Sequence, residues 1–463
     1  MKKLLILTTN YPPSTSIGTQ RILRICKYLD AERWKIHVLT LKEKFYPESG
    51  ASAGNGALSF LDRVTVWRTE KLDLVFFMLR LRERLRGSGR GSGNGGGNGA
   101  VVSEVHKRSA QKLLDGDGRI SPWQRFKDIV TDLLQFPDKN MPWLPVAVWR
   151  GWRTVRREGI DVIFSSSPPH SLHLMSALIK KLSGCRLVID YRDPWARSPW
   201  HDEERELNGF ERWKHNRIIA LERWVVRTAD VVLLITEQMQ RDFRAHYADL
   251  PAEKFQLFYN GFDPDNRRAV QAAVAGRAPG GERVTFMHAG SLYRYRDPSP
   301  IVQAVQNLIQ RGDVDRDRIR LTFIGSINSD QVHVTDMVRE MGLDDVVEFI
   351  PKVPYSQVWE YMAASDVLML LQPVTRLQLP GKFYDYLCVD RPILGVAEPD
   401  SPTATVVNDR FGLFVNYNEV GDIERGILAL YRQPGGFDER IRSNREAFDI
   451  SSSIQIIDRI LMG

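Results

Sequence analysis

The sequence predicts an α/β protein with two doubly wound parallel sheets, one in each half of the chain, that face each other across a cleft. Short apolar runs typical of buried strands alternate with segments of helical periodicity in both halves. At 463 residues the chain is also too long for one core, because domains usually hold about 100–200 residues. Residues 266–283 are rich in Arg, Ala and Gly and are predicted to be the interdomain linker.

The first half, residues 1–265, opens with a β-α-β arrangement. An apolar strand at residues 4–9 leads into a Pro-rich loop that ends at Gly18, and an amphipathic helix follows. The further strands of this half are expected at residues 34–41, 64–68, 161–164, 186–190, 231–235 and 255–258. Each lies between segments with helical periodicity or turn residues, which predicts a parallel sheet.

An insertion at about residues 70–140 interrupts this alternation. Residues 87–99 are nearly pure Gly, Ser, Asn and Arg, so this part is predicted to be flexible. The rest interleaves basic and aromatic residues. Two interpretations remain open: a lobe that faces a membrane or an acceptor, or a surface insertion whose aromatic side chains pack on the domain.

The second half, residues 284–445, alternates strictly between strands and helices. Its strands are expected at residues 284–289, 320–325, 346–350, 366–371, 393–396 and 411–415. This spacing predicts a second parallel sheet. The last segment, residues 446–463, has the pattern of an amphipathic helix and is expected to pack back on the N-terminal domain.

The composition favours certain classes of binding partner and a certain cellular location. A net charge of +7 and a pI of about 9.2 suit an anionic partner such as a nucleotide or a membrane surface, although a soluble basic protein has the same balance. No RNA-binding motif is recognisable, so no nucleic acid partner is expected. The three cysteines are scattered without metal-ligand spacing, and no apolar run is long enough for a transmembrane helix. We therefore expect a cytoplasmic protein, with the inner face of the membrane as a second location.

The stretch LPGKFYDYLCVDRPIL, residues 379–394, carries the most chemical information. A Pro-Gly break precedes a short helix, and a loop that feeds a helix N-terminus is a favoured place for phosphate. Lys382 and Asp385 fall on one face of that helix, because residues three apart are neighbours. The pair offers a cation for a phosphate and a carboxylate for sugar hydroxyls.

Neither half carries a G-x-G-x-x-G or Walker motif, which argues against a dehydrogenase or an NTPase. Instead, four stretches in order resemble the two-domain, GT-B type glycosyltransferases, specifically the family-4-like enzymes that build bacterial polysaccharides and glycolipids. They are NYPPSTSIGTQR, FYNGFDP, HAGSLYRYRDP and PGKFYDYLCVDRPIL. The shorter segments SSSPPHS and DYRDPW are similar to those of a subgroup. The resemblance covers almost the whole chain except residues 70–140.

The resemblance implies a donor site in the second half. Such a site needs cations and backbone amides, because the departing nucleotide diphosphate is anionic. The residues that it assigns to the donor are Gly18, Gly290, Arg296 with Arg294 as a rival, Gly381, Lys382 and Asp385. For Arg296, Lys382 and Asp385 the alternative is an ordinary solvent-exposed side chain, and for Gly18 it is a plain turn.

Two positions depart from the family pattern. Asp385 matches the second carboxylate of the family's E-x7-E pair, which accepts hydrogen bonds from ribose hydroxyls, but Leu377 stands where the first would be. The usual partner of the donor sugar's hydroxyls is therefore missing. Asp390 replaces a common helix-ending Gly, and we interpret it as structural, because Asp tolerates the left-handed conformation.

Three residues of the first half are candidates for catalysis. Arg192 lies where many relatives have a histidine that is catalytic or contacts the donor, and Asp193 beside it could act as general base toward an acceptor hydroxyl. Alternatively, Asp193 is a helix N-cap and Asp190 pairs with Arg192. His170 contacts acceptor or phosphate, or else is a capping or surface histidine.

The function that follows from the resemblance is a retaining glycosyltransferase. It moves a sugar from a nucleotide-diphosphate donor to a hydroxyl of a surface polysaccharide or lipid-linked saccharide, with the acceptor on the N-terminal domain. No metal or further cofactor is expected, and contact with a membrane is one possibility. Two other hypotheses stay open: a nucleotide-sugar epimerase of the same fold, and a non-catalytic nucleotide-sugar-binding subunit, which the missing carboxylate favours.

Overall fold

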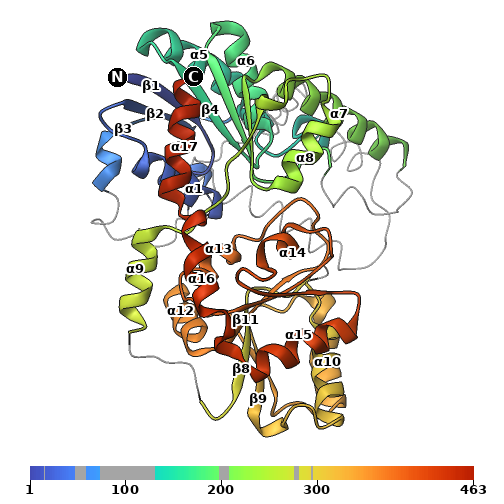
Figure 1. Cartoon of the computed structure of the whole chain (residues 1–463). Coiled ribbons are helices and arrows are strands. Elements are labelled where there is room, and N and C mark those ends of the chain that lie inside the picture. Colours follow the sequence, from blue (N-terminus) through green and yellow to red (C-terminus); the bar gives the residue numbers. More distant parts are fainter. Residues whose placement is uncertain (15, 47–58, 73–130, 198–207, 276–280, 294–295) are drawn as a thin grey trace, which may run out of the picture.

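In a computed structural model the chain forms two α/β halves, joined by a crossover near residue 260 (Figure 1). The structure describes residues 1–14, 16–46, 59–72, 131–197, 208–275, 281–293 and 296–463. The Gly-rich stretch 87–99, predicted to be flexible, and most of the insertion lie outside the described residues. Among the described helices, none combines the length and the apolar character needed to cross a bilayer.

The N-terminal half is built on a seven-stranded sheet with the order β3-β2-β1-β4-β5-β6-β7, and its paired strands are parallel. The strands are β1 (Lys2–Leu7), β2 (Trp34–Leu41), β3 (Val64–Thr69), β4 (Val162–Ser167), β5 (Arg186–Tyr191), β6 (Val231–Leu234) and β7 (Phe255–Leu257). The described helices of this half are α1 (Ile17–Tyr28), α5 (Leu144–Glu158), α6 (Ser171–Ser183), α7 (Gly209–Thr228) and α8 (Glu237–His246).

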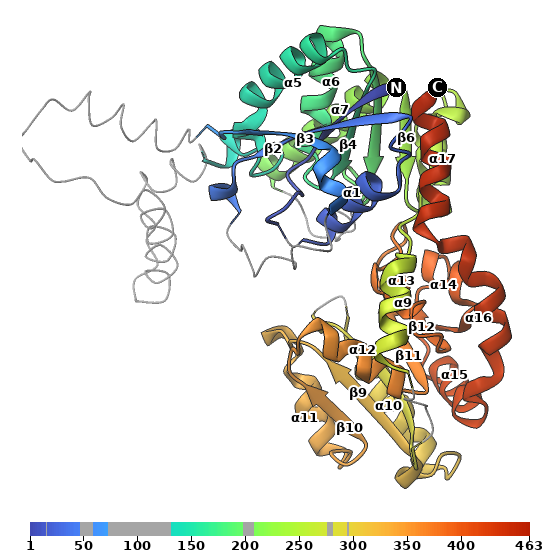
Figure 2. The ribbon, with the colours of Figure 1, turned by 90° about the vertical axis from the view of Figure 1, so that its left-hand side faces the viewer.

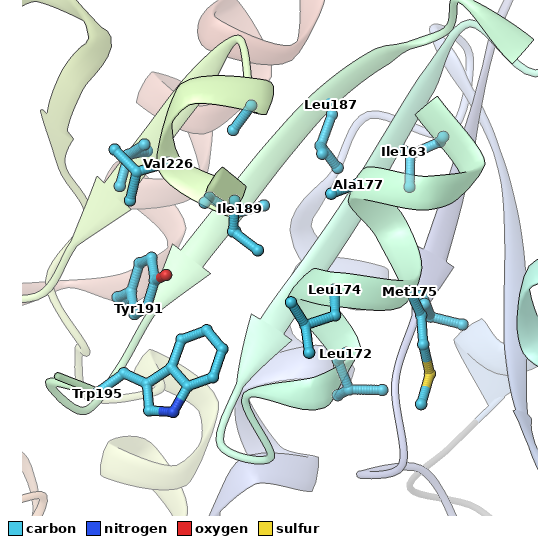
Figure 3. Close-up of a cluster of buried hydrophobic side chains, with 14 of the residues drawn as sticks. Ile163, Leu172, Leu174, Met175, Ala177, Leu187, Ile189, Tyr191, Trp195 and Val226 are labelled. Atoms are coloured by element: carbon cyan, nitrogen blue, oxygen red, sulfur yellow. The ribbon is translucent and has the colours of Figure 1, made fainter. Parts of the chain in front are cut away.

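The inner strands of this sheet bury both of their faces, which explains their continuous apolar runs. Leu5 and Leu7 join a core with α5, α6, α7 and α8, and Figure 3 shows part of that core around β4 and β5. Leu4 and Ile6 point to the opposite face, where α1 and the C-terminal helix cover the sheet. The predicted doubly wound class is confirmed for this half.

The C-terminal half repeats the plan with six strands in the order β10-β9-β8-β11-β12-β13, again with parallel pairing. The strands are β8 (Val284–Ala289), β9 (Ile319–Ile324), β10 (Val347–Ile350), β11 (Val367–Gln372), β12 (Ile393–Ala397) and β13 (Gly412–Asn416). The helices are α10 (Ser299–Gln310), α11 (His333–Glu340), α12 (Tyr355–Ala364), α13 (Lys382–Tyr386), α14 (Pro402–Val407), α15 (Val420–Arg432) and α16 (Asp438–Arg445). The second predicted parallel sheet is therefore also confirmed.

The segment predicted to be the interdomain linker, residues 266–283, begins within a helix, α9 (Pro264–Ala273). Asp263 caps it by accepting a hydrogen bond from the amide of Asp265 at 2.9 Å, and proline occupies the first helical position. Val270 is buried against the C-terminal core, so packing stabilises a segment whose Arg- and Ala-rich composition has a weak apolar pattern.

The last helix, α17 (Ile450–Met462), crosses back to the N-terminal sheet (Figures 1 and 2). Its residues Ile454 and Ile457 are fully buried in the same core as Leu4 and Ile6. The carboxylate of Asp458 accepts a hydrogen bond from the guanidinium of Arg33 at 2.5 Å. The two ends of the chain thus lie side by side, and the N-terminal half depends on a segment more than 400 residues away.

Both sheets change the direction of their winding at one point, between β1 and β4 in the first and between β8 and β11 in the second. In open α/β sheets, ligands bind outside the carboxyl ends of the strands at this switch point. The loops after β1, β4, β5, β8 and β11 are therefore the places where a functional site is expected.

We predict that Ile457→Ala lowers the free energy of unfolding by about 2–5 kcal/mol, because it leaves a cavity under α17. Ile456→Ala on the same helix is the matched control, since Ile456 is 47% exposed. Chemical denaturation would measure both, and the control should change stability by less than about 0.5 kcal/mol. Equal losses in the two variants would contradict the docking of α17 described above.

Candidate functional site

Lys382 begins α13 and directs its ammonium group over the turn that follows β8. Its Nζ atom is buried and has no hydrogen-bond partner among the described residues. A Cβ atom added to Gly290, whose φ is +145°, would lie 1.4 Å from that nitrogen. Glycine is favoured at position 290, because this φ strains other residues and a side chain there would displace the lysine ammonium.

Arg296 brings a second cation to the same turn. Its guanidinium donates to the side-chain oxygen of Gln372 at 3.4 Å, at the end of β11, and lies 4.9 Å from the ring centre of Tyr293. Burial, and secondly the positive charge of Arg296, lower the pKa of Lys382 to about 7. The structure therefore brings together two cations that form no ion pair with a carboxylate among the described residues, which is an arrangement suited to an anion. Arg294 lies outside the described residues.

Asp385 follows on the same helix, and burial raises the pKa of its carboxyl to about 6. Tyr355, at the start of α12, and Arg24, from α1 of the N-terminal half, oppose that shift by favouring the carboxylate. The side chains of Phe383 and Leu387 are buried in the core beneath. This packing fixes the helix, so that Lys382 and Asp385 are held at the carboxyl end of the sheet.

Gly381 and Leu377, near the start of α13, have different surroundings. Gly381 is exposed, and a Cβ atom there would meet nothing within 4 Å, so open space lies beside the first turn of α13. Leu377 instead packs against the N-terminal core, and its carbonyl accepts a hydrogen bond from the hydroxyl of Thr236 at 2.7 Å. The position expected to hold a carboxylate is an apolar contact between the two halves.

Asp390 is the last residue of the turn that follows α13. Its φ is +54°, so the predicted left-handed conformation is confirmed. The carboxylate accepts hydrogen bonds from Arg267 of α9 and from Arg445 of α16, each at 2.5 Å. Its role is structural, because both partners belong to helices that pack around the end of the motif.

Asp190, at the end of β5, is fully buried and pairs with Arg21 of α1 through two hydrogen bonds of 2.6 and 2.7 Å. Ser166 donates a third at 2.7 Å. The alternative in which Asp190 pairs with Arg192 is therefore wrong, because Arg21 takes both carboxylate oxygens. Sequence reasoning missed Arg21, although a basic residue next to the buried stripe of an amphipathic helix was a usable signal.

Arg192 turns back toward β4, where its guanidinium donates to the carbonyls of Ser167 at 2.9 Å and Pro168 at 2.7 Å. Gly18, in the first turn of α1, makes room for it. A Cβ atom at Gly18 would lie 2.6 Å from Arg192 Nη1 and 2.7 Å from the side-chain nitrogen of Asn10. The close approach expected at Gly18 is thus made by side chains of the protein itself.

Asp193 does not begin any described helix, so the N-cap alternative is wrong. Its carboxylate accepts a hydrogen bond from the side-chain amide of Gln378, which belongs to the C-terminal half. Burial raises the pKa of Asp193, while Arg192 and Gln378 oppose that shift. Asp193, the candidate general base, is therefore held by the loop that leads to Lys382. Gln378 and Asp193 lie 185 positions apart in the sequence, so no local pattern could predict this hydrogen bond.

His170 precedes α6 and stacks on Trp195, with ring centres 5.1 Å apart and planes 5° from parallel. His170 occupies the N-cap position of α6, but its side chain makes no capping hydrogen bond there. The stack places the imidazole beside the loop that holds Arg192 and Asp193.

Two parallel-sheet α/β domains, with a cationic turn at the carboxyl edge of the second, define the GT-B class of glycosyltransferases. Two family models place the chain more closely: residues 115–261 match the glycosyl transferase 4-like domain, and residues 275–448 match glycosyl transferases group 1. The chain therefore belongs to the family-4-like GT-B glycosyltransferases, as its motifs predicted.

Curated relatives include D-inositol 3-phosphate glycosyltransferase of Kribbella flavida, which is 23% identical over 224 residues, 46% of this chain and 51% of that protein. A second enzyme of that name, from Catenulispora acidiphila, is 21% identical and matches 61% of this chain and 60% of its own length. The chain thus spans about half the length of these relatives.

Solved structures show the same fold over the full length. HepE of Anabaena in complex with UDP has a TM-score of 0.60 at 13% identity, and the match covers all of both chains. Sucrose-phosphate synthase of Thermosynechococcus elongatus has a TM-score of 0.59 at 12% identity and covers 99% of this chain and 98% of that one.

We predict that Lys382→Met stabilises the ligand-free protein at pH 6 by about 1–3 kcal/mol, because it removes a buried cation beside Arg296. The gain should shrink between pH 7 and pH 10. There the wild-type lysine loses its proton in the folded state, with a pKa of about 7, but keeps it in the unfolded state.

Thermal unfolding across this pH range would measure the difference, with Lys352→Met as the control at an exposed lysine. A Lys382→Met protein that is less stable than wild type at pH 6 would show that the ammonium is compensated.

Proposed function

We propose that this protein transfers a sugar from a nucleotide-diphosphate donor to a hydroxyl group of a saccharide or lipid-linked saccharide, with retention of anomeric configuration. One observation carries the proposal: the Lys382 ammonium is buried without a hydrogen-bond partner among the described residues, over Gly290 and beside Arg296. A departing diphosphate is the anion that such a pair of cations stabilises best in this fold. The structures of HepE with UDP and with UDP-glucose support a donor of this class.

In this proposal the C-terminal half binds the donor, and the N-terminal half supplies the general base. Lys382 and Arg296 neutralise the diphosphate as the bond from the anomeric carbon to its oxygen breaks and the electron pair leaves with the phosphate. Asp385 accepts hydrogen bonds from the ribose hydroxyls. The acceptor oxygen attacks the anomeric carbon from the same face that the diphosphate leaves, so that the configuration is retained, and gives its proton to Asp193. Closure of the halves excludes water, which limits hydrolysis of the donor.

We predict that UDP or another nucleoside diphosphate raises the Tm of the wild-type protein and that Lys382→Met and Arg296→Ala each remove most of that shift. Lys352→Met should keep it, because that lysine lies outside the site. A thermal-shift screen against a panel of nucleotides and nucleotide sugars would test this. A shift that survives both site substitutions would overturn the assignment of the donor site.

The same binding should weaken as the pH rises above 7. The bound diphosphate needs the charged form of Lys382, whose pKa is about 7 in the free protein, so binding above that pH must take up a proton. Calorimetry at pH 8.5 in two buffers of different ionisation enthalpy would show the uptake, and in Lys382→Met it should vanish. Equal heats in the two buffers for the wild-type protein would contradict it.

Leu377 favours a second candidate function, a nucleotide-sugar-binding subunit without transfer activity, because the carboxylate expected for the donor sugar is missing. Incubating the protein with donor and a panel of acceptors, and following the products by NMR, would separate the candidates. A product of inverted configuration would overturn retention, and an isomerised donor sugar without acceptor would indicate an epimerase. Donor binding with no turnover would support the second candidate.

A further inference from the structure

The outer face of α5 carries tryptophan beside arginine over residues 149–157. Trp149 is 54% exposed, and the guanidinium of Arg153 lies 5.5 Å from the centre of its ring. One turn along, Arg156 lies at the same distance from the ring of Trp152. Ala147 and Val155 on the opposite side are buried, so the helix is fixed and this face is turned outward.

Among the described residues, no carboxylate forms an ion pair with the arginines of this face. Arg150, Arg153, Arg156 and Arg157 all lie on α5. Arginines elsewhere on the surface, such as Arg227 and Arg316, do have such partners. Arg150 instead lies 4.5 Å from the ring centre of Trp67 on β3. A surface with four cations and one acidic residue, Glu158, is complementary to an anionic partner.

We propose that the outer face of α5 docks on a membrane surface that contains anionic lipid. Tryptophan is favoured at the level of the lipid headgroups because its ring is apolar and its N–H is polar. Arginine beside it neutralises lipid phosphate and lays its apolar stem along the ring. A soluble anion accounts for the arginines but leaves 54% of a tryptophan side chain in water.

The position of α5 is compatible with such docking. The helix lies at the periphery of the N-terminal half, away from the C-terminal half (Figure 2). None of the residues that face Lys382, Asp385 or Asp193 belongs to it. The inference therefore concerns a surface separate from the donor site, and it can fail or succeed independently of the proposed transfer reaction.

The test uses the full chain and co-sedimentation with phosphatidylcholine vesicles, with and without phosphatidylglycerol. We expect wild-type protein to bind only the vesicles with phosphatidylglycerol. The double substitution Arg153→Gln, Arg156→Gln should lower the partition coefficient about tenfold or more, because each arginine near an anionic surface contributes to the attraction. The matched control is Arg440→Gln, Arg442→Gln on α16, which changes the net charge equally and should bind like wild type.

Trp149→Ala separates a membrane from a soluble polyanion. It should weaken vesicle binding several-fold while leaving retention on heparin unchanged, because only the membrane offers an apolar boundary to the ring. Circular dichroism and Tm would verify that each variant is folded. The proposal is overturned if wild type fails to bind the anionic vesicles at low salt, if the α16 control loses as much binding as the α5 variant, or if Trp149→Ala binds them unchanged.

Discussion

The buried ion pair between Arg21 and Asp190 is the contact on which the arrangement of the molecule depends. It joins α1 to the carboxyl end of β5, with both side chains almost completely removed from water. The same guanidinium donates to the carbonyl of Phe258 at 2.9 Å and to the side chain of Asn260 at 2.6 Å. A buried charge is costly unless it is paired and hydrogen-bonded. These contacts satisfy Arg21, and they tie the switch point of the first sheet to the crossover between the halves.

The next turns of α1 make further contacts with the crossover between the halves. Arg24 donates to the carbonyl of Gly261 at 2.6 Å, and Tyr28 donates to Asp263 at 2.7 Å. With the crossover held in this way, the loop before α13 reaches the N-terminal half, where Gln378 meets Asp193. The proton acceptor that we propose and the diphosphate site that we propose therefore lie at two ends of one short loop.

Local patterns were enough to predict the two sheets and the donor-side motif, because each depends on residues that are close in sequence. Apolar runs marked the strands, and the loop-to-helix pattern marked Lys382 and Asp385 on one face. The contacts that the sequence did not reveal join distant residues: Arg21 lies 169 positions from Asp190. Their pairing depends on which strand ends the topology brings together. Gly18 shows the same limit, since its need for space was predictable but the neighbour that uses the space, Arg192, was not.

The electrostatics of the site are unfavourable without a ligand, and this favours an anion as the ligand. Lys382 and Arg296 repel each other in a place that water reaches poorly, and the charge of Asp385 offsets only part of that repulsion. Such an arrangement lowers the stability of the folded protein unless an anion binds. The negative charge of the anion then compensates the two cations. The position expected to contact the donor sugar differs. Leu377 stands where the family pattern has a carboxylate, and its side chain packs between the halves. We therefore propose that the protein concentrates its binding free energy on the diphosphate, and that backbone groups beside Gly381 contact the sugar.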